Sequence, residues 1–216
     1  MSDDSALQKA VLAELNWEPS VAAGHIGVTA EDGVVCLTGH VESFAEKHAA
    51  EVAACRVRGV TAVANELEVR LPFDASRDDE AIAAAAADRL AWNASVPAGA
   101  VVATVDQGWV TLAGEVDWQY QREAAEQDMR QLIGVVGLTN DITIRSKVSA
   151  SNVSDDIMHA LHRSWFFDPQ TITVSVEDGR VRLGGTVHSP HERQVAMATA
   201  WAEPGVIEVE DEIAIL

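Results

Sequence analysis

The sequence predicts an α+β fold in which one small domain is repeated three times in tandem. A motif of the form G-x-V-x-L-x-G-x-V occurs at residues 33–41, 108–116 and 179–187. A second motif follows each copy and begins with Gly-Val at residues 59, 134 and 205. Successive copies of both motifs stand 75 and 71 residues apart. Two separate motifs that share one register indicate an internal repeat.

Each unit is expected to open with a helix and a β-hairpin. Apolar residues recur at i, i+4 and i+8 in the helices and alternate in the strand that follows. The helical stripes are Leu7, Val11 and Leu15, then Ile82, Ala86 and Leu90, then Val153, Ile157 and Leu161; the strand residues are Ile26, Val28 and Ala30, then Val101, Ala103 and Val105, then Ile172, Val174 and Val176. Gly33, Gly108 and Gly179 end the hairpin turns, because glycine readily adopts the positive φ that such turns need.

A second strand, a second helix and a last strand complete each unit. The second strand carries Val35 and Leu37, then Val110 and Leu112, then Val181 and Leu183; the helix carries Ala50, Ala54 and Val57, then Ala125, Met129 and Leu132, then Ala196 and Ala200 before Glu203 breaks the stripe; the last strand carries Leu67 and Val69, then Ile142 and Ile144, then Ile213 and Ile215. A strand–helix–strand connection is right-handed, so these two strands are expected to run parallel.

These elements predict three αββαβ units, each a small mixed three-stranded sheet with two helices on one face. The predicted domains are residues 1–72, 73–147 and 148–216. The linkers, residues 71–78 and 146–152, are short, and a unit of this size gains little stability from its own core, so we expect the units to pack on one another. The other motif glycines are expected in structural turns: Gly39, Gly59, Gly114, Gly134, Gly185 and Gly205.

The composition indicates a soluble and strongly acidic protein. The 216 residues include 15 basic and 34 acidic side chains, for a formal net charge of −19, and 48% are hydrophobic. This charge repels nucleic acid and the anionic face of a membrane. No apolar run approaches the ~20 residues that span a bilayer. Residues 1–15 lack the pattern of a signal peptide, so we expect a cytoplasmic protein, or a periplasmic one if a leader has been removed.

The combined motifs resemble the BON domain, a bacterial module. The resemblance rests on the motif at residues 33–41 and its repeats, the alanine-rich helix, and the pattern G-V-x-x-V-x-N-x-L, and it covers nearly the whole chain. Asp211 stands where the first two copies have Asn65 and Asn140. The resemblance implies an αββαβ fold and no catalytic residues. OsmY-like family members are associated with osmotic or general stress, with the cell envelope, and with phospholipid or other envelope ligands.

No cluster of residues predicts catalysis, a cofactor or a metal. Two histidine pairs have i, i+3 spacing, His159 with His162 and His188 with His191. A structural zinc site needs four ligands, often cysteines, so exposed histidines are favoured. Cys36 alternates with the core residues of its strand and lacks a paired base for nucleophilic catalysis. Cys55 is expected to pack within its helix.

Six tryptophans are the most informative candidates for binding. Aromatic residues follow the first helix of each unit, at Trp17, at Trp92, and at Trp165 with Phe166 and Phe167, and we expect them to cap the cores. Trp109 alternates with the core residues of its strand and must face away from the helices. With Trp118 and Tyr120 it forms a candidate contact surface, for a neighbouring unit, for a partner or second copy, or for lipid.

The sequence therefore predicts a non-catalytic binding or scaffolding protein linked to osmotic or general stress, with three modules that give multivalency. The expected partner is an unidentified protein or an envelope ligand, phospholipid among them, and a homo-oligomer is allowed. The alternatives are a peripheral phospholipid-binding protein and a small-ligand or cation sensor, because acidic loops can hold cations through oxygen ligands. Nucleic acid is not expected as a partner.

Overall fold

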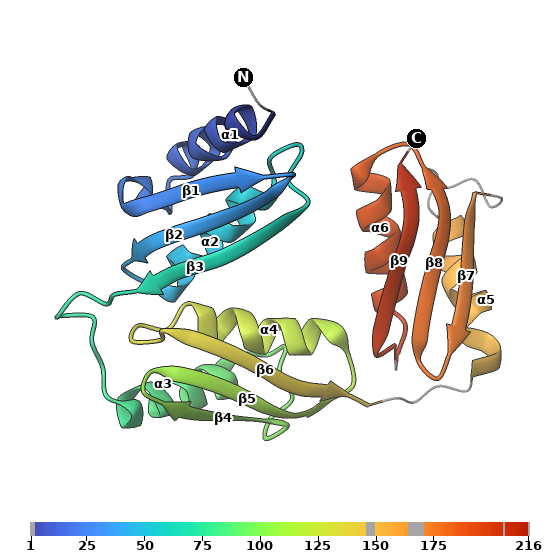
Figure 1. Cartoon of the computed structure of the whole chain (residues 1–216). Coiled ribbons are helices and arrows are strands. Elements are labelled where there is room, and N and C mark those ends of the chain that lie inside the picture. Colours follow the sequence, from blue (N-terminus) through green and yellow to red (C-terminus); the bar gives the residue numbers. More distant parts are fainter. Residues whose placement is uncertain (1–2, 146–149, 164–170, 205, 216) are drawn as a thin grey trace. The chain divides into compact units, whose positions relative to one another are not determined.

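The computed structural model describes residues 3–145, 150–163, 171–204 and 206–215. Within these ranges it contains three mixed three-stranded sheets, with strand orders β1-β2-β3, β4-β5-β6 and β7-β8-β9 (Figure 1). The elements are α1 (Asp3–Trp17), η1 (Ala23–His25), β1 (Ile26–Glu31), β2 (Val34–Val41), α2 (Phe44–Cys55) and β3 (Ala62–Val69); α3 (Asp79–Trp92), β4 (Val101–Asp106), β5 (Trp109–Val116), α4 (Gln119–Arg130) and β6 (Gly137–Ile144); and α5 (Ala150–His162), β7 (Ile172–Glu177), β8 (Arg180–Val187), α6 (Pro190–Trp201) and β9 (Glu208–Ile215). The predicted α+β fold with three repeated units is confirmed.

The central strand of each sheet joins an antiparallel and a parallel neighbour. β1 is antiparallel and β3 is parallel to β2, and β7 and β9 stand in the same relation to β8. In the middle unit, the Val136 amide donates to the carbonyl oxygen of Gly108 just before β5 and β6 begin. The Arg145 amide donates to Val116 where both strands end. The second and third strands of each unit are therefore parallel, as the right-handed crossover predicts.

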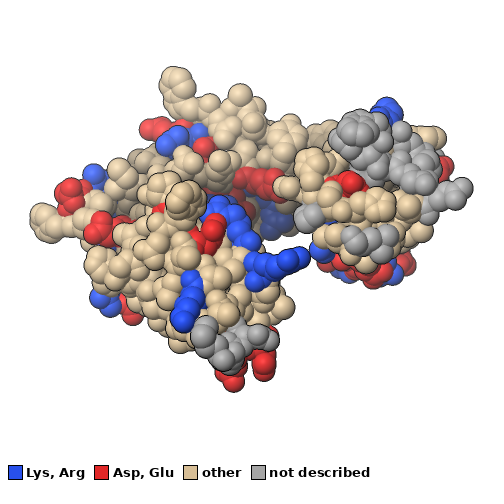
Figure 2. Space-filling model, turned by 90° about the horizontal axis from the view of Figure 1, so that it is seen from above, with Lys and Arg blue, Asp and Glu red and all other residues tan. Residues whose placement is uncertain are grey.

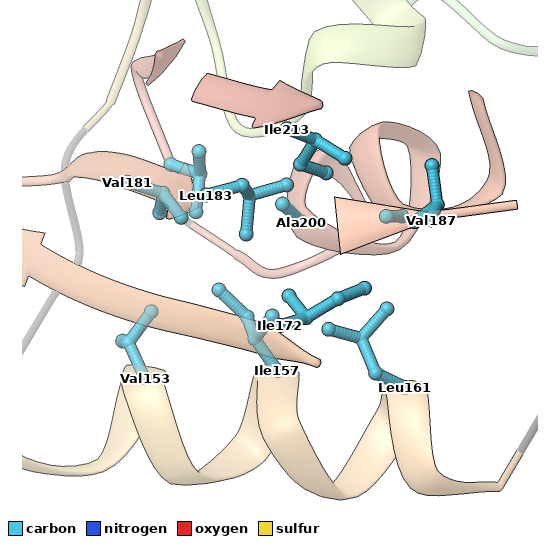
Figure 3. Packing of buried hydrophobic residues seen from close by; sticks show 11 residues of the cluster. Val153, Ile157, Leu161, Ile172, Val181, Leu183, Val187, Ala200 and Ile213 are labelled. Atoms are coloured by element: carbon cyan, nitrogen blue, oxygen red, sulfur yellow. The ribbon is translucent and has the colours of Figure 1, made fainter. Parts of the chain in front are cut away.

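Each core lies between one face of a sheet and the two helices of the same unit. In the third unit, Val153, Ile157 and Leu161 extend from α5 toward the sheet residues (Figure 3). The buried cluster of this unit is Val153, Ile157, Leu161, Ile172, Val181, Leu183, Val187, Ala196, Ala200, Val206 and Ile213. The first unit repeats this cluster with Val11 and Leu15 from α1. The alternating strands and the striped helices thus bury the predicted positions.

The hairpin turns place two successive residues at positive φ, which is the geometry of a type I′ turn. The φ pairs are +48° and +83° at Asp32-Gly33, +51° and +78° at Gln107-Gly108, and +48° and +81° at Asp178-Gly179. A type I′ turn matches the right-handed twist of the paired strands, so it fixes the register of each hairpin.

A second set of glycines lies near the end of each central strand. The φ values are +111° at Gly39, +147° at Gly114 and +116° at Gly185. A Cβ atom at these positions would collide with the carbonyl oxygens of His25, Ala100 and Thr171, respectively. Of the remaining motif glycines, Gly59 and Gly134 both have φ +96°, and Gly205 lies outside the described residues.

Candidate binding surfaces

A polar side chain in β3 and in β6 ties the strand to the second helix of its unit. Asn65 accepts a hydrogen bond from the amide of Leu67 (3.3 Å) and donates one to Glu51 of α2 (3.0 Å). In the middle unit, Asn140 accepts from Ile142 (3.2 Å) and donates to Glu126 of α4 (2.8 Å). These asparagines are half-buried and serve the fold, so the asparagine of the family pattern is a structural residue here.

Asp211 keeps the same backbone geometry in the third unit. Its Oδ1 atom accepts from the amide of Ile213 (3.0 Å), and its Oδ2 atom accepts from Arg193 Nε of α6 (2.6 Å). The departure from asparagine therefore leaves the turn of the strand intact. It changes the partner on the helix from a carboxylate to a guanidinium.

Trp109 lies on the helix-free face of the middle sheet, as the strand alternation predicts. Its Nε1 atom donates to Thr139 Oγ1 of β6 (2.9 Å), and its six-membered ring packs on Gly137, where a Cβ atom would collide with it. Trp109 is 49% exposed, whereas Gly137 is buried. The middle unit itself thus covers part of the indole.

Trp118 and Tyr120 lie at the start of α4 (Gln119–Arg130). β5 begins at Trp109 and ends at Val116, so Trp118 follows the opposite end of the strand. The rings of Trp118 and Tyr120 lie 6.3 Å apart at their centroids. Trp118 precedes α4 (Gln119–Arg130), where Gln121 Oε1 accepts from the amides of Asp117 and Trp118 at 3.0 and 3.1 Å. These three residues therefore stand at different ends of β5 in the sequence, and their role as a contact surface stays a prediction.

Trp17 and Trp92 are exposed, and the expectation that they cap the cores is wrong. They are the last residues of α1 and α3 and are 83% and 89% exposed. Each follows a buried leucine, Leu15 or Leu90, by two residues. Two residues correspond to about 200° of helical rotation, so the indole points away from the core. Trp165, Phe166 and Phe167 lie outside the described residues.

Cys36 and Cys55 are both free thiols and lie in different surroundings. Burial, together with the Glu66 carboxylate, raises the pKa of the Cys36 thiol, which disfavours the reactive thiolate. Cys55 is exposed rather than packed, because it is one helical position beyond the buried Ala54. No group of three or more His, Cys, Asp or Glu residues that could hold a metal ion occurs among the described residues.

Several of the described histidines lie at the surface or in a stacked pair. His159 and His188 are exposed. His25 and His40 stack with ring centroids 4.7 Å apart, a contact that the sequence spacing did not reveal. Cross-strand register explains it, because Ile26 pairs with Gly39 and the two histidines are the next residues outward.

A groove between α5 and α6 lies on the third unit. Its volume is about 830 Å³, and its lining includes Ala160, Ala198 and Ala202, with Asp156 and Glu203 beside them. Burial raises the pKa of the Glu203 carboxyl, and the Asp156 carboxylate adds to the effect.

The surface carries charges of both signs, because acidic and basic side chains both appear on the face of the molecule in Figure 2. No helix in the described ranges is long and apolar enough to cross a membrane.

This chain is similar to known proteins and matches the model of a known domain family. The BON domain model matches residues 3–70, 78–146 and 149–216. Osmotically-inducible protein Y of Escherichia coli (strain K12) is 33% identical over 144 residues, which are 65% of this chain and 72% of that protein. An uncharacterized protein in the gshII 5' region of Anaplasma centrale is 51% identical over 45 residues, 21% of this chain and 30% of that protein.

A solved structure of CdsD, a structural protein of the type III secretion system of Chlamydia trachomatis, is 16% identical with a TM-score of 0.28 and covers 98% of this chain and 92% of that chain. A score this low does not bear on the fold. The family model, in contrast, matches three times over sheets that share one strand order and one turn geometry. The chain therefore belongs to the BON domain family and consists of three tandem BON domains.

Proposed function

We propose that this chain is a non-catalytic, multivalent binding protein of the osmotic or general stress response. The relation to osmotically-inducible protein Y supports the stress context. Three linked copies of one domain support multivalency, because linked modules bind a repeated target with a higher apparent affinity than a single module. The proposed target is a protein or an envelope ligand, and the cytoplasmic location remains a prediction.

The observation that carries this proposal is the pair of exposed tryptophans at equivalent positions. Trp17 ends α1 and Trp92 ends α3, and both indoles are more than four-fifths exposed. Burying apolar surface stabilises a complex by about 25 cal/mol per Å², and tryptophan is enriched among the residues that carry binding energy. An exposed indole repeated at one place in a duplicated domain is expected where that place contacts a target.

Co-purification from cells under osmotic stress, followed by mass spectrometry of proteins, lipids and metabolites, tests the proposal. The wild-type chain is compared with Trp17→Ala, Trp92→Ala and the double variant. The expected result is one class of bound molecule that decreases in each single variant and is lost in the double variant. Phe73→Ala is the matched control, because Phe73 is 99% exposed and belongs to no repeated position.

Equal recovery of every bound molecule by the wild-type chain and the double variant would contradict the role of the two tryptophans. Because both side chains are exposed, the substitutions should leave the melting temperature unchanged. A changed melting temperature would instead assign the indoles to the fold.

The second candidate function is peripheral binding to a lipid surface, and the same two tryptophans favour it. Indole rings are enriched at the interface between bilayer and water, whereas the net charge of −19 opposes anionic lipid. Flotation with phosphatidylcholine vesicles should then recover the wild-type chain but not the Trp17→Ala/Trp92→Ala variant. Binding only to anionic vesicles, strengthened at low salt, would indicate a local basic patch and would exclude this version of lipid binding.

A further inference from the structure

The indole of Trp109 is held flat against its own sheet. Nε1 is fixed by Thr139 Oγ1 at 2.9 Å, and the six-membered ring rests on Gly137, two residues earlier in β6. The residue as a whole remains 49% exposed. Because one ring face lies on the strand, the exposed surface is mainly the opposite ring face. A ring that is already ordered loses little conformational entropy on binding.

The equivalent positions of the other two units carry no aromatic ring. In the first unit, Val34 pairs with Ala62 across β2 and β3. In the third unit, Arg180 pairs with Glu208 in register, and their charged groups lie 3.1 Å apart. The exposed aromatic face is therefore a property of the middle unit and not a requirement of the fold.

An acidic residue stands across the hairpin from Trp109. Asp106 ends β4 and Trp109 begins β5, and the equivalent residues Glu31 and Val34 are paired across the first hairpin. The same hairpin geometry places Asp106 beside Trp109. Asp106 is exposed and forms no ion pair in the ranges that the structure describes. Residues 73–147 contain twelve acidic and six basic side chains, so the middle unit attracts cations.

We propose that Trp109 and Asp106 form a binding site for an arginine side chain of a basic partner protein. The guanidinium plane would stack on the open indole face, where the ring quadrupole attracts a cation, while the Asp106 carboxylate accepts its N–H groups. Charge selects this occupant: a second copy of this chain, at −19, and an anionic lipid surface are both repelled. The proposal involves neither Trp17 nor Trp92 and does not rest on the function proposed for them.

A fluorescein-labelled hexaarginine peptide tests the site on the full chain, with fluorescence anisotropy to measure Kd. Trp109→Val, which introduces the residue of the first unit, should weaken binding by about two- to fivefold. Asp106→Asn should weaken it by about twofold. Asp88→Asn is the matched control, because Asp88 is exposed on α3 and the substitution removes one negative charge away from the site. It should weaken peptide binding less than Asp106→Asn does.

NMR of the full chain gives a second readout that does not depend on the variants folding alike. The indole N–H resonance of Trp109, assigned by its loss in Trp109→Val, should shift on addition of hexaarginine, while those of Trp17 and Trp92 stay in place. Three outcomes overturn the proposal: an unchanged Trp109 resonance, equal losses of affinity in Asp106→Asn and Asp88→Asn, or a resonance that responds to phosphatidylcholine vesicles and not to the peptide.

Discussion

Arg193 of α6 and Asp211 of β9 form an ion pair with Nε and Oδ2 2.6 Å apart, where the other two units pair an asparagine with a glutamate. The equivalent of Glu51 and Glu126 in the third unit is Met197. The single carboxylate has thus moved from the helix to the strand, while the helix keeps Lys47, Arg122 or Arg193 one turn earlier. Each unit thus places one basic and one acidic side chain where its second helix packs on its last strand.

We expect Asp211→Asn to lower the free energy of unfolding of the third unit by about 0.5–1 kcal/mol, because Arg193 loses its carboxylate in a partly exposed pair. Met197→Glu alone should also destabilise the unit, since it places a second carboxylate near Asp211. The double variant restores the arrangement of Asn140 and Glu126 and should recover most of the loss. Differential scanning calorimetry of the full chain measures the shifts, and simple additivity of the two losses would refute the coupling.

A second exchange concerns Trp109 and Gly137. Gly137→Ala should displace the indole and cost about 1–3 kcal/mol, because it overpacks the contact. Trp109→Val/Gly137→Ala reproduces the Val34 and Ala62 pair of the first unit. The double variant should therefore be more stable than Gly137→Ala alone, with a coupling energy of about 1 kcal/mol in a double-mutant cycle. An indole N–H resonance of Trp109 that is unchanged in Gly137→Ala would argue against this contact.

Gly114→Ala should be far more disruptive than Gly99→Ala. Both glycines have positive φ, +147° and +74°, so both variants carry backbone strain, about 1–2 kcal/mol for alanine. At Gly114 the new Cβ also meets the carbonyl oxygen of Ala100, whereas nothing lies within 4 Å at Gly99. We expect a loss above about 3 kcal/mol for Gly114→Ala. Thermal melts of both variants isolate the steric part, and equal melting temperatures would exclude it.

Glu203 predicts a pH dependence in the third unit. Because burial and Asp156 raise its folded pKa, the folded state binds more protons than the unfolded state between the ordinary and the raised pKa. The free energy of unfolding should therefore fall as the pH rises through this window. Glu203→Gln should remove that fall and raise the melting temperature at pH 7. The control is Asp155→Asn, which changes an exposed residue of α5 next to Asp156. This substitution should leave the pH profile unchanged.

The fold and the cores could be predicted because they follow from periodicity. Leu112 and Leu161 are buried as their patterns require. The predictions for Trp17 and Cys55 are wrong because helical position, and not residue type, decides burial: Trp17 is about 200° from Leu15 and Cys55 about 100° from Ala54. The helical stripes themselves contained the correct answer.

Other contacts needed a comparison between the repeats. Ser43 and Ser189 cap α2 and α6, and each accepts from the amide of a glutamate three residues later. Trp118 stands at the same place before α4, which could have indicated a helix terminus rather than a surface aromatic. Aligning the repeats places Gly137 at the same strand position as Ala62 and Glu208, so its unusual residue type could have been noticed from the sequence. Its contact with Trp109 could not, because that contact depends on the rotamer of the indole.

The alternation of side chains along β2, β5 and β8 has a consequence for how such a protein diversifies after gene duplication. One face of each strand carries the core residues, and the other face carries the solvent-exposed residues. A substitution on one face can therefore leave the residues of the other face unchanged. The outer positions differ between the repeats as contacting pairs: valine with alanine, tryptophan with glycine, arginine with glutamate. Each pair consists of two cross-strand neighbours, so exchanging pairs between repeats would give a protein engineer three chemically distinct surfaces on one architecture.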